Sequence, residues 1–226
     1  MTSVRLTSAD TRQVLRYMGT PPEQTDEALV ALVQDCDRAL REAVQPRWLS
    51  LTAGIAFEAE GVRLDSGLLL PGRDILTHLA GCDRVVLFCA TLGAEADRLI
   101  RTAQCTDVLR ALALDCTASD LVEQLCDRAE QTLHAALPGC HFPYRYSPGY
   151  GDLPIALNAC ILDLLDAPRK LGLCVTDSGL LTPRKSVTAL LGVSRHPIDK
   201  HKRSCLGCPA HDGCPHRKTG GHCGFS

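Results

Sequence analysis

The longest uninterrupted helical pattern in the chain does most to limit the possible folds. Residues 106–137 contain neither glycine nor proline, and Pro138 ends the run. Apolar side chains recur along it at helical spacing, namely Leu114, Ala118, Leu121, Leu125 and Ala129. A spacing of three or four residues places such side chains on one face of an α-helix. The sequence therefore predicts one long helix with a single face buried against the rest of the protein.

Shorter segments of both kinds surround this helix, without regular alternation. Helices are predicted at residues 8–18, between Pro22 and Pro46, and at 74–79, 93–103 and 154–166. Strands are predicted within residues 47–70 and at 84–90, 172–176 and 186–194. Strands and helices mixed without repeated β–α–β units are typical of an α+β protein. We expect a twisted, largely antiparallel sheet with flanking helices, followed by a small cysteine-rich C-terminal tail.

Composition narrows the class of protein further. The 226 residues are 45% hydrophobic and 22% charged, which excludes wholesale disorder. A net charge of −2 gives no overall positive field that would hold a nucleic acid. No apolar stretch approaches the ~18–20 residues of a membrane-spanning helix, and residues 1–13 lack the apolar core of a secretory signal. We expect a cytoplasmic protein that binds neither nucleic acid nor membrane.

Thirteen cysteines are the one count that stands out. An odd number of thiols in a reducing compartment does not favour a disulfide framework. Nine lie within residues 1–194, mostly at apolar positions such as Cys36, Cys126 and Cys160, and are predicted to be small buried hydrophobic side chains. The other four fall in the last 22 residues, where the apolar pattern has ended. The sequence therefore predicts a domain at residues 1–194 and a separate tail at 195–226.

The tail has the composition of a metal site. Its cysteines are Cys205, Cys208, Cys214 and Cys223, and five of the eight histidines also lie in residues 195–226. Zinc favours two Cys-x2-Cys pairs, and only the pair at 205–208 is present. An iron–sulfur cluster tolerates looser spacing, often with a proline after a ligand, as after Cys208 and Cys214. Both metals, and an unmetallated tail, remain open at this point.

A loop at residues 138–153 concentrates groups that can bind a small ligand. Three of the four tyrosines of the chain lie within it, at Tyr144, Tyr146 and Tyr150. Pro148 and Gly149 favour a tight turn that a ligand could approach closely. Arg145 can hold a carboxylate through two parallel hydrogen bonds, and a tyrosine face can contact a heterocycle or a sulfonium. A surface loop with a proline turn explains the same residues about as well.

The loop sequence RYSPGYGDLP (residues 145–154), followed by PRKSV (183–187), resembles the activation domain of cobalamin-dependent methionine synthase, in particular its free-standing short form. A Tyr-x-Gly element at 17–19 and an Ala-Thr-Leu-Gly element at 90–93 are similar to that family as well. The resemblance covers most of residues 10–194. It implies binding of S-adenosylmethionine and reductive methylation of cob(II)alamin on a partner, the cobalamin-binding methyltransferase (methionine synthase). An electron donor such as a flavodoxin or ferredoxin is implied too.

The resemblance also implies site residues. Arg145, Pro148, Gly149 and Tyr150 would hold S-adenosylmethionine, with Arg145 on its carboxylate. Glu123, on the long helix, matches a glutamate that contacts the ligand in the family, and it shares a face with Ser119, Asp120 and Asp127. The catalytic residues stay unknown at this point. The implied redox role favours an iron–sulfur cluster over zinc in the tail.

Three other functions compete with this interpretation. The chain could be a scaffold that binds S-adenosylmethionine or a corrinoid methyltransferase without turnover. It could be a small redox protein whose chemistry lies wholly in the tail. A zinc-tailed nucleic-acid-binding protein is disfavoured by the charge balance. Binding of S-adenosylmethionine separates the reactivation component and the scaffold from the redox protein and the nucleic-acid-binding protein.

Overall fold

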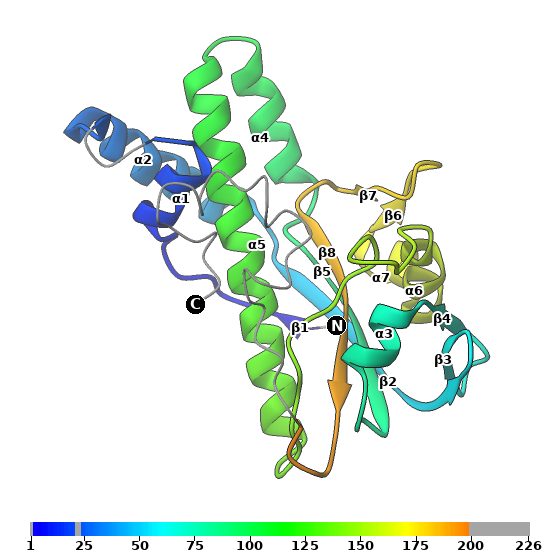
Figure 1. The fold of residues 1–226 in the computed structure, drawn as a ribbon. Helices are drawn as coiled ribbons and strands as arrows, with labels where there is room; N and C mark the ends of the chain where they lie inside the picture. The colour runs from blue at the N-terminus through cyan, green and yellow to red at the C-terminus, as the bar shows by residue number, and fades with distance from the viewer. Residues whose placement is uncertain (1, 21–23, 199–226) are drawn as a thin grey trace. The chain divides into compact units, whose positions relative to one another are not determined.

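The computed structural model describes residues 2–20 and 24–198, and its main sheet is antiparallel (Figure 1). The strand order is β4-β3-β2-β5-β8, with β1 paired to β2. These strands are β1 (Thr2–Ser3), β2 (Arg47–Glu58), β3 (Gly61–Leu64), β4 (Leu69–Pro71), β5 (Arg84–Thr91) and β8 (Ser186–Val193). A separate pair is formed by β6 (Cys174–Val175) and β7 (Leu181–Thr182). The α+β class predicted from the sequence is confirmed.

The direction of the long strands follows from hydrogen bonds at their ends. The amide of Gln45 donates to the carbonyl of Leu92 at 3.1 Å, and the amide of Ile55 donates to Asp83 at 3.4 Å, so β2 and β5 run in opposite directions. Leu92 and Asp83 likewise bond to residues 185 and 193, at opposite ends of β8. The neighbouring β2–β3 and β3–β4 pairs are also antiparallel.

The chain divides into two compact units. Unit 1 contains the described residues of Met1–Leu51, Leu87–Pro138 and Ile155–Ala189. Unit 2 contains those of Thr52–Val86, Gly139–Pro154 and Leu190–Ser226. The strands β2, β5 and β8 each contribute residues to both units. The predicted division at residue 194 remains a prediction, because residues 199–226 lie outside the described part of the chain.

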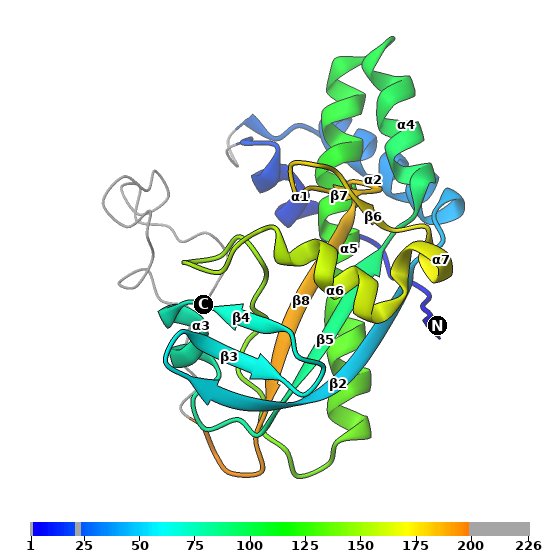
Figure 2. The same ribbon diagram turned by 90° about the vertical axis from the view of Figure 1, so that its right-hand side faces the viewer.

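Unit 1 contains most of the helices. They are α1 (Thr11–Tyr17), α2 (Glu27–Ala43), α4 (Ala94–Gln104), α5 (Val108–Ala136), α6 (Leu157–Leu165) and α7 (Ala167–Leu171). The long helix α5 contacts α1, α2 and α4. Within this unit, α5 covers one face of the sheet, and α6 and α7 cover the other (Figure 2). Cover on both faces explains why nearly every residue of β5 is buried.

Aspartates fix where several of these helices begin. Asp10, Asp26 and Asp107 precede α1, α2 and α5, and each accepts a hydrogen bond from an amide in the first turn. Such a cap satisfies one of the amides that a helix end leaves without an intrahelical acceptor. The predicted apolar stripe of α5 is confirmed, since Leu114, Ala118, Leu121, Leu125 and Ala129 are all buried.

The cysteines in the described residues only partly match the prediction. Five are buried, namely Cys36, Cys82, Cys89, Cys116 and Cys126, and Cys140 is half-buried. Cys160 is exposed, so its predicted burial is wrong, and Cys105 and Cys174 are exposed as well. Cys160 lies on α6, whose buried face carries Leu157, Ile161, Leu162 and Leu165. Its apolar neighbours in sequence belong to the opposite face of the helix.

Unit 2 holds the predicted loop and a short helix. The helix α3 (Arg73–His78) lies beside β3. The loop forms two bridges along the last strand, joining Tyr146 to Leu190 of β8 and His141 to Ser194, which directly follows β8. The loop thus lies along the outer side of the last strand of the sheet. None of the helices in the described ranges is long and apolar enough to cross a membrane.

Candidate functional site

The loop that carries the sequence RYSPGYG contains a tight turn. The amide of Tyr150 donates to the carbonyl of Ser147 at 3.1 Å, which closes a four-residue turn. Pro148 occupies its second position, and Gly149 occupies the third with a φ of 93°. A proline followed by a residue with positive φ is the signature of a type II turn. The turn predicted from Pro148 and Gly149 is therefore present, and it presents Tyr150 at its end.

Two aspartates clamp the end of the loop to the first turn of α3. The carboxylate of Asp152 accepts hydrogen bonds from the amides of Arg73, at 2.6 Å, and Asp74, at 3.2 Å. In return, the carboxylate of Asp74 accepts the amide of Asp152 at 3.2 Å. Charged acceptors suit these amides because the first turn of a helix carries excess positive charge. We call this reciprocal pair the aspartate clamp.

Glycine is required where the clamp closes. Gly151 has a φ of 53°, and a Cβ at this position would collide with the carboxylate of Asp74 and the hydroxyl of Tyr146. A Cβ at Gly72, which precedes α3, would collide with the carboxylate of Asp152. The carboxylates of the clamp and the hydroxyl of Tyr146 therefore occupy the space that a side chain at either glycine would need.

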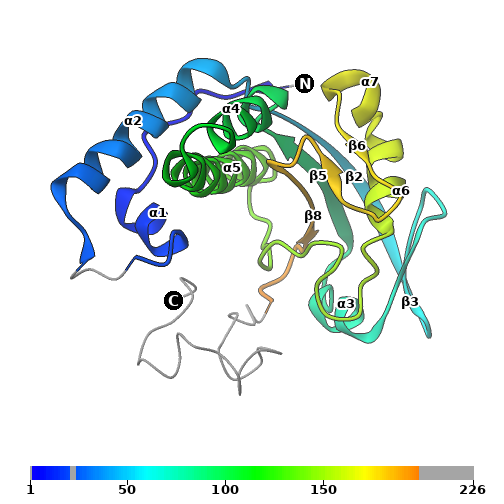
Figure 3. The ribbon, with the colours of Figure 1, turned by 90° about the horizontal axis from the view of Figure 1, so that it is seen from above.

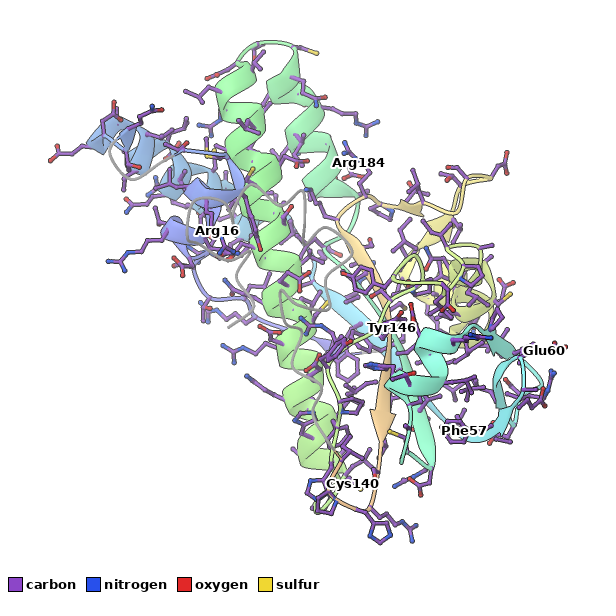
Figure 4. The ribbon with its side chains drawn as sticks, in the orientation of Figure 1. Arg16, Phe57, Glu60, Cys140, Tyr146 and Arg184 are labelled. Atoms are coloured by element: carbon purple, nitrogen blue, oxygen red, sulfur yellow. The ribbon has the colours of Figure 1, made fainter. Side chains whose placement is uncertain are left out.

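Aromatic rings pack beneath the loop. The ring of His78, at the end of α3, lies 4.6 Å from the ring of Tyr144 and 4.7 Å from that of Tyr146. Tyr146, which is labelled in Figure 4, is buried. Its hydroxyl donates to the carbonyl of Tyr150 at 3.1 Å. The ring of Tyr150 meets that of Tyr146 edge to face at 5.9 Å. These contacts hold both ends of the turn in place.

The predicted ligand residues of the loop differ in exposure. Pro148 is buried, Arg145 is half-buried, and Gly149 and Tyr150 are exposed, with Tyr150 at 46%. The backbone amide and carbonyl of Tyr146 both form hydrogen bonds with Leu190, so the chain is paired here as in a strand. Successive side chains therefore alternate between two sides. Arg145 and Ser147 therefore project from the side opposite Tyr146. The turn thus carries a phenol ring and a glycine backbone, and the guanidinium of Arg145 lies two residues before it.

Two residues that contact this loop could not be predicted from the local sequence. His78 and the clamp partner Asp74 lie about 70 residues before the loop and carry no recognisable motif. A lone histidine and a lone aspartate in a short helical segment are too common to indicate a site. Only the pairing of unit 2 elements brings them under the loop.

Glu123 lies on α5 in unit 1 and is exposed. Two of the residues predicted to share its face, Asp120 and Ser119, make contacts within unit 1. Asp120 is buried and accepts a hydrogen bond from the amide of Asp10 at 3.1 Å, as well as one from Gln124. Burial raises the pKa of the Asp120 carboxyl. Ser119 accepts a hydrogen bond from Lys185.

The other segments of the resemblance contact one another within unit 1. Ser186, from PRKSV, donates to the hydroxyl of the buried Thr91 at 2.7 Å. Thr91 belongs to the Ala-Thr-Leu-Gly element and accepts the amide of Gly93 at 3.0 Å. These two motifs therefore join the start of β8 to the end of β5.

Lys185, the third residue of PRKSV, is a buried cation. Its ammonium group lies 3.0 Å from a carboxylate oxygen of Asp115 and donates to the hydroxyl of Ser119 at 2.9 Å. A third hydrogen bond goes to the carbonyl of Asp115. Three acceptors satisfy the three N–H groups, which is what a buried lysine requires. The contact ties β8 to α5.

The four cysteines predicted as metal ligands, Cys205, Cys208, Cys214 and Cys223, lie outside the described residues. Within residues 2–20 and 24–198, no group of three or more His, Cys, Asp or Glu side chains is placed to hold a metal ion. The metal site therefore remains a prediction from the sequence.

Similarity to known proteins is found at the level of the fold. No protein-family model and no curated protein matches the sequence. A solved structure described as the MetH reactivation domain bound to AdoHcy is similar in fold, with a TM-score of 0.62 and 16% sequence identity. The match covers 96% of this chain and 86% of that one. The chain therefore has the fold of the reactivation domain, as the resemblance of its motifs predicts.

Proposed function

We propose that the chain is an S-adenosylmethionine-binding reactivation component for a cobalamin-dependent methionine synthase, acting in the cytoplasm. The observation that carries the proposal is the rigid RYSPGY turn on a reactivation-domain fold. Arg145 is the candidate for the carboxylate of the ligand, and the exposed ring of Tyr150 for its adenine or sulfonium. Pro148 and Gly149 shape the turn between them, and Glu123 is a further candidate contact.

The reaction that this role requires is a one-electron reduction followed by methyl transfer. An electron from an external donor, such as a flavodoxin or ferredoxin, converts cob(II)alamin on the partner to cob(I)alamin. The reduced cobalt attacks the methyl carbon of S-adenosylmethionine, so that the sulfur–carbon bond breaks and a cobalt–carbon bond forms. S-adenosylhomocysteine leaves with the electron pair of the broken bond. In this role the chain has only to bind and orient the methyl donor.

Calorimetric titration of the full chain with S-adenosylmethionine tests the proposal directly. Saturable binding is expected, and Arg145→Ala should weaken it by about tenfold or more, because a charge-assisted hydrogen bond contributes about 1.5–3 kcal/mol. Arg63→Gln is a suitable control, because Arg63 lies in unit 2 and its ion pair with Glu58 is exposed. Unchanged affinity in Arg145→Ala would remove this residue from the site. Absence of binding to the wild type would overturn the proposal.

A reconstituted assay separates reactivation from passive binding. Partner methionine synthase in the cob(II)alamin state, with an electron donor and S-adenosylmethionine, should regain activity only when this chain is added. Binding without recovery would favour the alternative of a scaffold that holds a corrinoid methyltransferase without turnover.

For the tail, we propose that Cys205, Cys208, Cys214 and Cys223 bind a metal centre, with an iron–sulfur cluster favoured by the redox role. Protein purified without oxygen should then be brown and should bleach with dithionite, whereas zinc is colourless. Cys208→Ser should remove the colour and leave S-adenosylmethionine binding intact. Colourless protein with one zinc per chain would refute the cluster.

A further inference from the structure

An arginine-lined cavity in unit 1 has no role in the function proposed above. It has a volume of about 510 Å³ and is lined by Arg5, Leu6, Arg38, Arg41, Val44 and Arg47, among others. Its lining residues come from the N-terminal segment, from the C-terminal end of α2 and from the start of β2. Figure 3 shows the course of these elements. We call it the arginine cavity. Its size falls within the ~300–1,000 Å³ that is usual for small-molecule sites.

Buried groups hold two of the four guanidinium groups in place. Arg41 lies 2.9 Å from the carboxylate of Asp37, which is itself buried and also accepts the amide of Ala9 at 3.0 Å. Arg47 donates to the carbonyl of Leu171 at 3.1 Å. Groups that are already fixed lose little conformational entropy when a ligand binds. This part of the cavity is thus preorganised.

The other two arginines can turn toward a ligand. Arg5 is exposed, and Arg38 makes only an exposed ion pair with Asp35 on the same helix. Exposed pairs of this kind are weak and are easily exchanged for a better acceptor. Arg38 and Arg41 also line a second cavity, of about 280 Å³, beside the first.

The charge of the cavity differs from that of the chain. The lining contains four arginines and one acidic residue, Glu42. With Asp35 and Asp37 included, four cations still exceed three anions, although the whole chain carries −2. Planar guanidiniums match the oxygens of phosphate in pairs, which makes arginine the preferred residue for such groups. Leu6 and Val44 add an apolar wall beside the charges.

We propose that the arginine cavity binds a small molecule that carries two or more linked phosphate groups. Either a nucleoside polyphosphate or a free phosphate chain has this chemistry. The fixed pair Arg41 and Arg47 provides the initial contact, and Arg5 and Arg38 close on the remaining oxygens. The site is independent of the loop at 145–150, which belongs to unit 2.

Titration of the full chain with pyrophosphate, tripolyphosphate and ATP tests this site. Pyrophosphate should bind saturably, and more weakly as salt is raised, because its charges are screened. The double variant Arg5→Gln/Arg38→Gln should lose about tenfold in affinity while unfolding at an unchanged temperature, since both side chains are exposed. Tighter binding of ATP than of tripolyphosphate would identify a nucleotide ligand, and equal binding would identify the phosphate chain alone.

The chain provides a closely matched control. Arg98 makes an exposed ion pair with Glu95 at the same i,i+3 spacing as Arg38 with Asp35, but on α4 and outside the cavity lining. Arg98→Gln should therefore bind pyrophosphate as the wild type does. Absence of saturable binding, or an equal loss in Arg98→Gln, would overturn the assignment.

Discussion

Removing the aspartate clamp should loosen the candidate site by a measurable amount. Asp152→Ala deletes the carboxylate that accepts the amides of Arg73 and Asp74, leaving the first turn of α3 without its cap. Loss of such a cap costs about 0.5–2 kcal/mol, and two amides are affected. We therefore expect a loss of about 1–2 kcal/mol in the free energy of unfolding. For a chain of this size, each kcal/mol corresponds to about 2–4 °C in melting temperature.

The effect should extend to ligand binding, because the clamp fixes the end of the loop that carries Tyr150. Urea unfolding and S-adenosylmethionine titration measure the two consequences on the same samples. Asp152→Asn keeps one oxygen acceptor and should fall between Asp152→Ala and the wild type. Asp177→Ala removes an exposed acid from the turn between β6 and β7, so it should leave both measurements unchanged. If Asp152→Ala were as stable as Asp177→Ala, the clamp would not stabilise the fold, and this reasoning would fail.

Other consequences concern buried groups of unit 1. Lys185→Met should lower the free energy of unfolding by about 1–3 kcal/mol, since the half-exposed Asp115 loses its cation; urea unfolding equal to the wild type would contradict the role given to Lys185. Burial raises the pKa of Asp120 above 3.8, so the native state holds this proton more tightly than the unfolded state and stability falls as pH rises above that value. In pH-dependent unfolding, Asp120→Asn should lack this component, and parallel curves for the two proteins would disprove it. Burial also raises the pKa of the Cys89 thiol to about 12, so iodoacetamide at neutral pH should label Cys105 and leave Cys89 unmodified, as peptide mass spectrometry can show.

Sequence reasoning succeeded where a pattern is long or chemically specific. The stripe on α5 repeats over many turns, so its period alone fixes which face is buried. The strand predicted at residues 84–90 matches β5, because a short continuous run of apolar and β-branched residues is typical of a buried strand. The turn at Pro148 and Gly149 follows from the backbone limits of two residues. In each case the information is local.

The features that could not be predicted have no such local pattern. The short elements β1, β7 and α7 contain too few residues to show a period. The apolar neighbours of Cys160 predict burial, and only the helical phase of α6 shows that its side chain points the other way. The clamp joins Asp74 and Asp152, which are 78 residues apart in sequence, so no local pattern contains it.

The bridges between the loop and β8 also bear on solubility. β8 is a terminal strand of the sheet, and an uncovered terminal strand offers its amides and carbonyls to strands of other molecules. Both backbone groups of Leu190 bond to Tyr146, and both of Ser194 bond to His141. The segment that forms the candidate ligand site therefore also occupies positions where a second chain could pair. A substitution that detaches this loop would be expected to promote aggregation as well as to impair binding.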